Sequence, residues 1–421
     1  MLYITKRDGR KEPFNKRKIE RAMEKAYLQV DGEIDEYAEE KIHNIANFIE
    51  HKVEGGEDLG VEEIQDLVEN GLMNTRDKDV ARAYIIYRND RTRKRQSNTA
   101  LMKSVKEKIA ASNVQNQNAN VDERSFGGRK GEASNEVMKQ LALDEIMSPM
   151  ARENHLNNMI YTHDLDSYAL GEHNCLTLPI DELLANGFNT RQTDIRPAGS
   201  INTAFQLVAV LFQIQSLQQF GGVAISHADW TMVPYVRKSF KKHLKDGAKY
   251  IVRGDAILDN LLASDKEICI DDSFIKENYP KLYEYAYDMT VKETNQAVEG
   301  MYHNLNSLQS RSGNQLPFSS LNYGTCTLPE GRLVIRAILE GSIKGIGKLH
   351  RTSVFPCGIF KMKKGVNREP GDPNYDLYRL ALESTSKRLY PNYANCDWSG
   401  NAGYDPNDPR TEFSTMGKRK L

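Results

Sequence analysis

The chain has 421 residues, and its 57 Lys and Arg residues nearly balance 58 Asp and Glu residues, giving a formal net charge of −1. So small a net charge provides no general attraction to nucleic acid or to an anionic membrane. Hydrophobic residues make up 39% and charged residues 27%, which is typical of a globular protein with a substantial core. No segment approaches the roughly 18 apolar residues of a membrane span, and no apolar signal segment opens the chain. A cytoplasmic protein of about two or three domains is therefore expected.

Residues 1–95 are predicted to form a compact domain of their own. The pair Asp8-Gly9 separates two short extended segments and is a strong signal for a β-hairpin. Asn15 is then expected to cap a helix whose apolar residues recur at helical spacing. Three further helices are predicted, around residues 42–49, 64–72 and 81–91. The domain is therefore expected to be a β-hairpin cap on about four helices.

The rest of the chain differs in composition. A basic run at 91–95 is interpreted as a solvated helix end rather than a nucleic-acid site, given the net charge of the chain. Residues 96–134 are polar and are predicted to be a linker. In residues 135–421, apolar helical segments alternate with turns rich in Gly and Pro, which indicates an α/β domain. Residues 197–228 contain no Lys, Arg, Asp or Glu but several Gln, which favours a buried helix or a subunit interface over a membrane span.

The predicted hairpin carries the chemistry of a phosphate site. A tight turn at Gly9 lets the backbone approach a ligand. Asn15 lies at a helix N-terminus, where free N–H groups and the helix dipole favour an anion. Glu12 could accept a hydrogen bond from an adenine amino group or a ribose hydroxyl. Positive charge comes from three nearby side chains, Lys6, Arg7 and Lys18. An ordinary basic hairpin with a capping asparagine is the alternative explanation.

These first 95 residues resemble the ATP-cone domain, a module that binds ATP or dATP as an on/off effector of ribonucleotide reductases. The resemblance rests on three segments: Lys6-Arg-Asp-Gly9, Glu12-x-Phe-Asn-x-x-Lys-Ile19 and Ile64-Gln-Asp-Leu-Val-Glu69. It implies ATP/dATP contacts from Lys6, Arg7, Gly9, Glu12, Asn15, Lys18, Arg88 and Arg91. The cone also occurs in a short transcriptional repressor with a Cys-rich zinc ribbon, and this sequence has neither property.

Later segments resemble one family, the anaerobic (class III) ribonucleoside-triphosphate reductases. They follow the family order: Asn120–Gly128, Ile160–Asp166, His173–Leu176, Gly221–His227, Pro370–Tyr375 and Ser386–Pro391. The resemblance implies a ten-stranded α/β barrel, incomplete in this chain, around a cysteine-tipped loop. It also implies a homodimer that reduces ribonucleoside triphosphates to deoxyribonucleoside triphosphates. A glycyl radical, made by a separate radical-SAM activase, generates the thiyl radical that starts this reaction.

Within this resemblance, Cys175 corresponds to the family's second active-site cysteine, which assists loss of the 2′-hydroxyl and its reduction. A weak S–H bond donates a hydrogen atom readily, and a sheltered site protects radical intermediates. His163 is expected to line the same pocket, and Asp194 and Arg196 are candidate contacts for a specificity effector at a homodimer interface near 197–228. The remaining cysteines are expected to be core thiols: Cys269, Cys326, Cys357 and Cys396. No C-x-x-C pair occurs, so no metal site is predicted.

The sequence departs from the family near residue 418. The family pattern Ser-x-Met-Gly-Cys-Arg carries the thiyl-bearing cysteine where this sequence has Lys418. An ammonium group cannot replace that thiol, because an N–H bond is much stronger than S–H and ammonium has no lone pair. The family's four-cysteine zinc site and Arg-Val-x-Gly-Tyr glycyl-radical loop are not encoded in these residues, and Gly403-Tyr404 is expected to be a turn.

Two functions follow as expectations. The first is the N-terminal part of a reductase large subunit that is inactive alone and works with a C-terminal fragment in trans. The second is a non-catalytic ATP/dATP-binding regulatory or dimerisation module.

Overall fold

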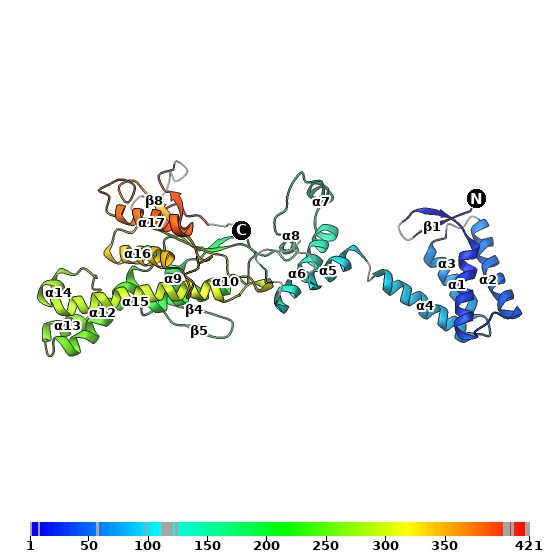
Figure 1. Cartoon of the computed structure of the whole chain (residues 1–421), viewed down its shortest axis with the longest axis horizontal. Coiled ribbons are helices and arrows are strands. Elements are labelled where there is room, and N and C mark those ends of the chain that lie inside the picture. Colours follow the sequence, from blue (N-terminus) through cyan, green and yellow to red (C-terminus); the bar gives the residue numbers. More distant parts are fainter. Residues whose placement is uncertain are drawn as a thin grey trace. The chain divides into compact units, whose positions relative to one another are not determined.

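The computed structural model describes residues 2–6, 9–55, 59–96, 99–110, 121–122, 125–398, 405 and 408–416. The chain divides into two compact units, Met1–Lys103 and Ser104–Leu421, whose elements are labelled along the sequence in Figure 1. Among the described residues, no helix combines the length and the apolar character needed to cross a membrane.

The first unit is a β-hairpin on four helices, as its sequence predicts. Strands β1 (Tyr3–Thr5) and β2 (Lys11–Pro13) pair antiparallel, and Gly9 between them adopts a φ of +80° that few other residues tolerate. The side chain of Asn15 accepts a hydrogen bond from the Lys18 N–H and so caps the first helix. The four helices are α1 (Lys16–Val30), α2 (Glu36–Glu54), α3 (Val61–Met73) and α4 (Lys78–Gln96). Their apolar stripes meet in one core that includes Met23, Ala46, Ile49 and Leu72.

The segment predicted as a polar linker, 96–134, contains helix α5 (Ala100–Ala110) and the first half of α6 (Phe126–Leu141). Polar side chains join these two helices, since Ser104 donates to Glu136 over 2.9 Å and Lys108 pairs with Glu132 at 3.1 Å. In the described parts of this segment, polar side chains therefore make contacts between helices.

The second unit contains a parallel five-stranded sheet in the order β3-β6-β7-β8-β9. Helical crossovers join the strands, as parallel pairing requires. The strands are β3 (Leu176–Thr177), β6 (Val223–Ile225), β7 (Ser319–Tyr323), β8 (Cys357–Met362) and β9 (Asn392–Asn395). The larger helices are α10 (Ile201–Gln215), α12 (Val233–Ile251), α15 (Pro280–Ser307), α16 (Pro329–Lys344) and α17 (Tyr375–Arg388). This arrangement confirms the predicted α/β class.

Shorter elements complete the second unit. They are a π-helical turn (Ala142–Ile146), α7 (Pro149–Leu156), α8 (Leu165–Tyr168), α9 (Ile180–Asn186), the hairpin β4 (Phe188–Asn189) and β5 (Asp194–Ile195), α11 (Ala228–Thr231), α13 (Ala256–Ala263), α14 (Ser273–Asn278) and two 3₁₀ turns (Ser312–Asn314 and Pro409–Thr411).

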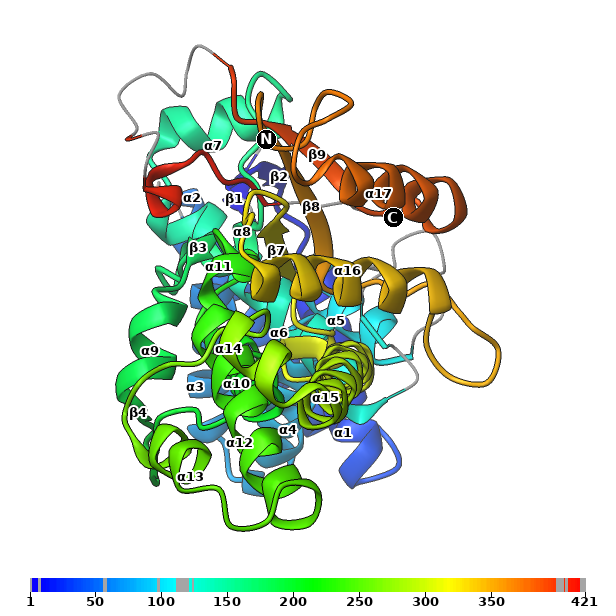
Figure 2. The ribbon, with the colours of Figure 1, turned by 90° about the vertical axis from the view of Figure 1, so that its left-hand side faces the viewer.

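The two faces of the parallel sheet differ in chemistry. Side chains alternate along a strand, so Leu321, Tyr323 and Phe360 point to one face, where they join the hydrophobic core with the helices. Figure 2 shows α15 and α16 on the same side of β7 and β8. The opposite face, called the inner face below, carries one large apolar residue, Ile359, and otherwise small or polar residues by the same alternation, including Thr177, Ala224, Ser320, Asn322 and Lys361.

The uncharged stretch 197–228 supplies helix α10 and strand β6. Helix α10 packs against α15, and Leu211 is only 7% exposed within its own chain. Most of the apolar surface of α10 therefore belongs to the core of the second unit. This burial explains the lack of charge in the stretch without a subunit interface.

Candidate functional site

The first unit contains a cavity of about 160 Å³ beneath the hairpin. Four residues expected at a phosphate site line it together: Lys6, Glu12, Asn15 and Lys18. The rest of its wall is mainly apolar and includes Ile4, Phe14, Ile19, Ile64, Val68 and Tyr84. A cavity with an apolar wall, two cations and a helix N-terminus suits a ligand with a flat base and an anionic group.

Glu12 links the two lysines of this cavity. Its carboxylate lies 2.8 Å from Lys6 Nζ and 2.9 Å from Lys18 Nζ. These hydrogen bonds lower the pKa of Glu12 to about 2, so the carboxylate is charged at neutral pH. A phosphate that enters this cavity must therefore compete with Glu12 for both ammonium groups.

The other expected nucleotide contacts lie elsewhere or outside the described residues. Arg7 falls outside them. Gly9 forms the hairpin turn, where its N–H donates to the Lys6 carbonyl over 2.9 Å. Arg88 ion-pairs with three carboxylates, those of Glu62, Asp66 and Glu69, and Arg91 Nε donates a hydrogen bond to the Tyr87 hydroxyl at 3.0 Å. Neither arginine is among the residues that line the described cavity.

Cys175 immediately precedes β3, at the amino end of the parallel sheet. Alternation along the strand puts it on the same face as Thr177, which is the inner face. The thiol is half-buried and accepts a hydrogen bond from the Gly222 N–H at 3.4 Å. Arg311 supports this turn, because its guanidinium donates to the carbonyl oxygens of Phe220 and Gly221, each over 2.9 Å.

Gly221 allows two chain segments to approach closely at Cys175. A Cβ on Gly221 would lie 2.4 Å from the backbone nitrogen of Cys175. We expect Gly221→Ala to destabilise the second unit by about 1–3 kcal/mol, as overpacked sites do, with a lower melting temperature as the readout. Gly199→Ala is the matched control, because nothing lies within 4 Å of its added methyl. Equal melting temperatures for the two variants would contradict this assignment.

The segment Glu412–Met416 lies against the inner face. Thr415 and Asn322 of β7 exchange two hydrogen bonds of 3.0 Å, from the Thr415 N–H to Asn322 Oδ1 and from Asn322 Nδ2 to the Thr415 carbonyl. Glu412 accepts a hydrogen bond from Thr325 Oγ1 at 3.0 Å, beyond the carboxyl end of β7. The segment therefore runs antiparallel to β7, toward the end of the sheet where Cys175 lies.

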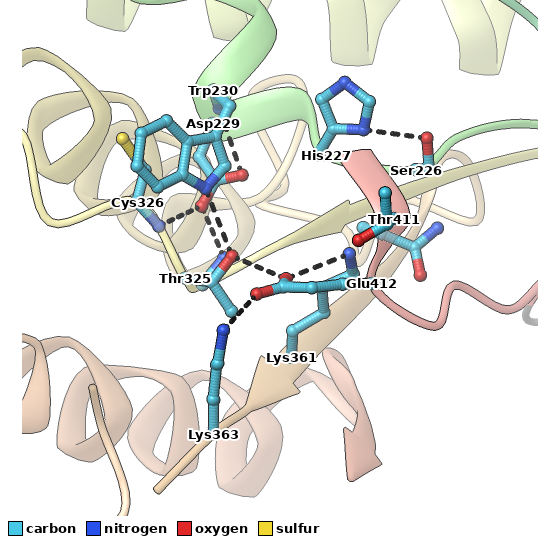
Figure 3. Close-up of polar contacts among 12 residues, drawn as sticks. Ser226, His227, Asp229, Trp230, Thr325, Cys326, Lys361, Lys363, Thr411 and Glu412 are labelled. Carbon is cyan, nitrogen blue, oxygen red and sulfur yellow. Dashed lines mark hydrogen bonds and ion pairs between the residues drawn. The ribbon is translucent and has the colours of Figure 1, made fainter. Parts of the chain in front are cut away.

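Two lysines of the β8 region hold the Glu412 carboxylate, which Figure 3 shows between them and Thr325. Lys363 Nζ lies 2.8 Å from Glu412, and Lys361 Nζ lies 3.4 Å from it. The side chain of Lys361 is fully buried and that of Glu412 is 5% exposed. A buried lysine near the carboxyl end of a strand requires such a counter-charge, because an unpaired buried charge is costly.

Asp229 fixes the loop that carries Thr325. Its fully buried carboxylate accepts hydrogen bonds from the backbone N–H groups of Gly324 (2.8 Å) and Cys326 (2.9 Å). Burial raises the pKa of Asp229, and these two hydrogen bonds oppose the rise. Trp230 Nε1 donates to Thr325 Oγ1 at 3.2 Å, so a continuous polar network reaches from Asp229 to Glu412 (Figure 3).

The remaining expected site residues are not brought to this face by any described contact. His163 is half-exposed and pairs with the neighbouring Asp164. Among the described residues, no hydrogen bond or ion pair joins His163 to Cys175. Asp194 and Arg196 are exposed on and just after β5, and Lys418 lies outside the described residues, as does Gly403-Tyr404.

The other cysteines have structural surroundings. Cys326, Cys357 and Cys396 are buried, and burial raises the pKa of Cys396 to about 11. Cys269 is half-buried and donates to Asp271 at 2.8 Å. Burial, followed by that hydrogen bond, raises the pKa of Cys269 to about 12, which disfavours a reactive thiolate.

Comparison with known proteins identifies both units. Residues 2–93 match the family model of the ATP cone domain, and residues 117–420 match that of the anaerobic ribonucleoside-triphosphate reductase. The chain belongs to the anaerobic ribonucleoside-triphosphate reductase family. It is 33% identical over 398 residues to the anaerobic ribonucleoside-triphosphate reductase of Haemophilus influenzae, covering 94% of this chain and 52% of that protein. It is 30% identical over 398 residues to the Escherichia coli reductase, covering 94% of this chain and 51% of that protein.

The chain thus spans about half the length of these curated reductases. A crystal structure of the anaerobic ribonucleotide reductase from Thermotoga maritima, with dATP bound in the specificity site, is 14% identical with a TM-score of 0.45. That match covers 71% of this chain and 48% of that chain.

Sequence reasoning did not single out Asn322, Lys361, Glu412 or Asp229. A signal existed for two of them, since Lys361 interrupts an apolar strand segment and Asp229 follows one. Polar residues at the carboxyl ends of parallel strands commonly face a site. Glu412 gave no such signal before the structure placed it beside Lys361.

Proposed function

We propose that the first unit of this reductase-family chain binds ATP or dATP as an allosteric effector. The cavity that contains Lys6, Lys18 and the N-terminus of α1 supports this proposal, together with the match to the ATP cone domain. The lysines would hold the phosphates, and the apolar wall with Phe14 and Tyr84 would take the base. Arg88 and Arg91 would contribute only after leaving their present partners.

Lysine substitutions test this site in the full chain. We expect Lys6→Ala and Lys18→Ala each to weaken ATP binding by about 1.5–3 kcal/mol, the usual worth of a hydrogen bond to a charged group. Isothermal titration calorimetry gives the dissociation constants. Lys25→Ala is the control, since Lys25 is exposed on α1 and does not line the cavity. Unchanged affinity in both cavity variants would exclude this site.

Glu12 has two competing roles that one variant separates. If it only neutralises the lysines, Glu12→Ala should strengthen binding of both ATP and inorganic tripolyphosphate. If it also accepts a hydrogen bond from the adenine amino group or the ribose, the variant should gain affinity for tripolyphosphate alone, because alanine has no acceptor. The same calorimetry distinguishes the two outcomes.

We propose further that the second unit is part of the catalytic barrel of an anaerobic ribonucleoside-triphosphate reductase. The observation that carries this proposal is the inner face, where Cys175 lies at one end and the segment Glu412–Met416 runs toward that end. Five parallel strands with a mostly small or polar inner face would form half of a ten-stranded barrel. The outer strands β3 and β9 are the edges at which further strands would pair.

In this proposal, Cys175 is a hydrogen-atom donor during reduction at the 2′ carbon of a ribonucleoside triphosphate. Its half-buried thiol, held by Gly222, would face the substrate from the inner face. His163, Asp194 and Arg196 stay candidates, for the substrate pocket and the specificity effector respectively. Deoxyribonucleotide formation with a C-terminal reductase fragment, with and without Cys175, is the experiment that tests the catalytic role.

The glycyl radical and zinc of the family are not assigned to these residues. Among the described residues, no three His, Cys, Asp or Glu side chains come together in a way that could hold a metal ion. The radical-SAM activase, a homodimeric assembly, a C-terminal partner fragment and a cytoplasmic location are proposed from family membership. Helix α10 would contribute to a homodimer only through its exposed side chains, such as Ile214, because Leu211 is in the core.

A further inference from the structure

We propose that Lys361 is a positioning residue that docks the segment Glu412–Met416 on the inner face of the sheet through the charge of Glu412. The inference rests on the proposed function for its consequence, because that segment leads to the position where the family carries its radical cysteine. The docking itself is a property of this chain and can be measured without turnover.

Burial is the first argument. Lys361 lies in β8 with a fully buried side chain, on the face opposite the hydrophobic core residue Phe360. A lysine in this place cannot reach water, so its charge needs a carboxylate. Glu412 supplies that carboxylate from outside the sheet.

The number of contacts on one carboxylate is the second argument. One carboxylate oxygen of Glu412 accepts hydrogen bonds from Lys361 and Thr325, and the other oxygen accepts one from Lys363. It thereby joins β8 to the loop that Asp229 holds after β7. Because these partners belong to the β8 region and to the loop after β7, the carboxylate fixes both where the segment begins and how it crosses the sheet.

The third argument is direction. Beyond Glu412, the segment is held again at Thr415, whose backbone pairs twice with Asn322. Two anchors three residues apart define a line, and this line leads along β7 toward the end of the sheet that carries Cys175. Loss of the Glu412 anchor would remove the charged contact at the start of the segment and leave the Asn322 anchor at Thr415, about which the start of the segment could move.

The chain carries its own reporters of docking. It has two tryptophans. Trp230 donates to Thr325, which contacts Glu412, and Trp398 lies against Phe413 with ring centroids 5.9 Å apart. Trp398 is 57% exposed, so its quenching by acrylamide should rise further when Phe413 leaves. Variants with Trp230→Phe or Trp398→Phe assign each signal to one tryptophan.

The test compares Glu412→Gln and Lys361→Met with the parent chain, by acrylamide quenching and by chymotrypsin cleavage after Phe413. Cleavage of a locally opening segment follows the population of its open form, so we expect acceleration of about tenfold or more in each variant. In the double variant, the cleavage rate should rise by less than the product of the two single accelerations, because both substitutions remove the same interaction. Glu383→Gln, in an exposed ion pair with Lys387 on α17, is the control and should change neither signal.

Each outcome decides the inference. Unchanged quenching and cleavage in Glu412→Gln would overturn it. If circular dichroism shows that Glu412→Gln loses the fold of the whole unit, the ion pair stabilises the core of the unit rather than docking one segment, and the inference is wrong. A docked segment in a chain that forms no product with a C-terminal reductase fragment would refute the proposed catalysis and leave the docking intact.

Discussion

The 421-residue chain, assayed anaerobically with activase, S-adenosylmethionine and a reductant, is expected to form no deoxyribonucleotide. Under the proposed function, reduction requires a thiyl radical, and Lys418 stands where the resemblance to the family expects its cysteine. The Arg-Val-x-Gly-Tyr motif that would store the radical does not occur in these residues. Cys175 could donate a hydrogen atom but could not start the cycle. Chromatographic detection of deoxyribonucleotide from labelled ribonucleoside triphosphate is the measurement.

Adding a reductase fragment that begins at the radical cysteine should restore some turnover if the two pieces dock. In that mixture Cys175→Ala should abolish product formation. Cys269→Ala should retain it, because Cys269 contacts Asp271 outside the inner face. Product from the 421-residue chain alone would contradict the assignment of the radical position. ATP binding with no product in any mixture would favour the regulatory or dimerisation module.

Local signals made the first unit predictable. The turn at Asp8-Gly9 and the helical spacing of apolar residues depend on neighbours within a few positions, and the hairpin and four helices follow them. Within the segment 96–134, the polar composition does not indicate helices α5 and α6. These helices are held by contacts such as Lys108 with Glu132, which composition alone does not reveal.

The second unit was predictable in class but not in detail. Alternating helical and turn segments indicate α/β, whereas strand order depends on pairing between distant segments such as β6 and β7. The motif around Cys175 singles out a residue of the inner face, and its catalytic role stays a prediction. Lys361 and Glu412 are separated by 51 positions, so their pairing became visible only with the fold.

In the first unit, too, the sequence does not reveal which charged residues pair with one another. The sequence names Lys6, Lys18 and Arg88 as cations but not the carboxylates that hold them. Arg88 forms ion pairs with acidic residues of α3, including Glu69 at 2.9 Å, and the two lysines both form ion pairs with Glu12. Which cation lines a cavity is therefore decided by tertiary pairing rather than by residue type.

Removal of the charge of Arg237 is expected to have the largest effect on stability. Arg237 Nε donates to Glu330 Oε1 at 3.0 Å, where α12 meets the start of α16, and the Glu330 side chain is fully buried. Arg237→Met would leave this carboxylate buried without its cation, which costs about 3–5 kcal/mol. The melting temperature of the second unit should fall by on the order of 10 °C. Arg336→Met, in an exposed pair with Asp376, is the control and should cost no more than about 1 kcal/mol.

The pH dependence of the melting temperature tests whether Glu330 is the group that Arg237→Met leaves unpaired. Burial is the largest single influence and would raise the pKa of Glu330, but the hydrogen bonds from Arg237, from Cys269 and from backbone N–H groups together outweigh it, so the pKa is lowered. In the parent chain, the pair therefore stabilises the fold above the ordinary carboxyl pKa and loses its effect as the pH falls through the lowered value. In Arg237→Met, burial would raise the pKa of Glu330, so protonation on acidification relieves the buried charge. The difference in melting temperature between parent and variant should shrink as the pH falls from 7 toward 4. A constant difference would show that Glu330 is not the group left unpaired.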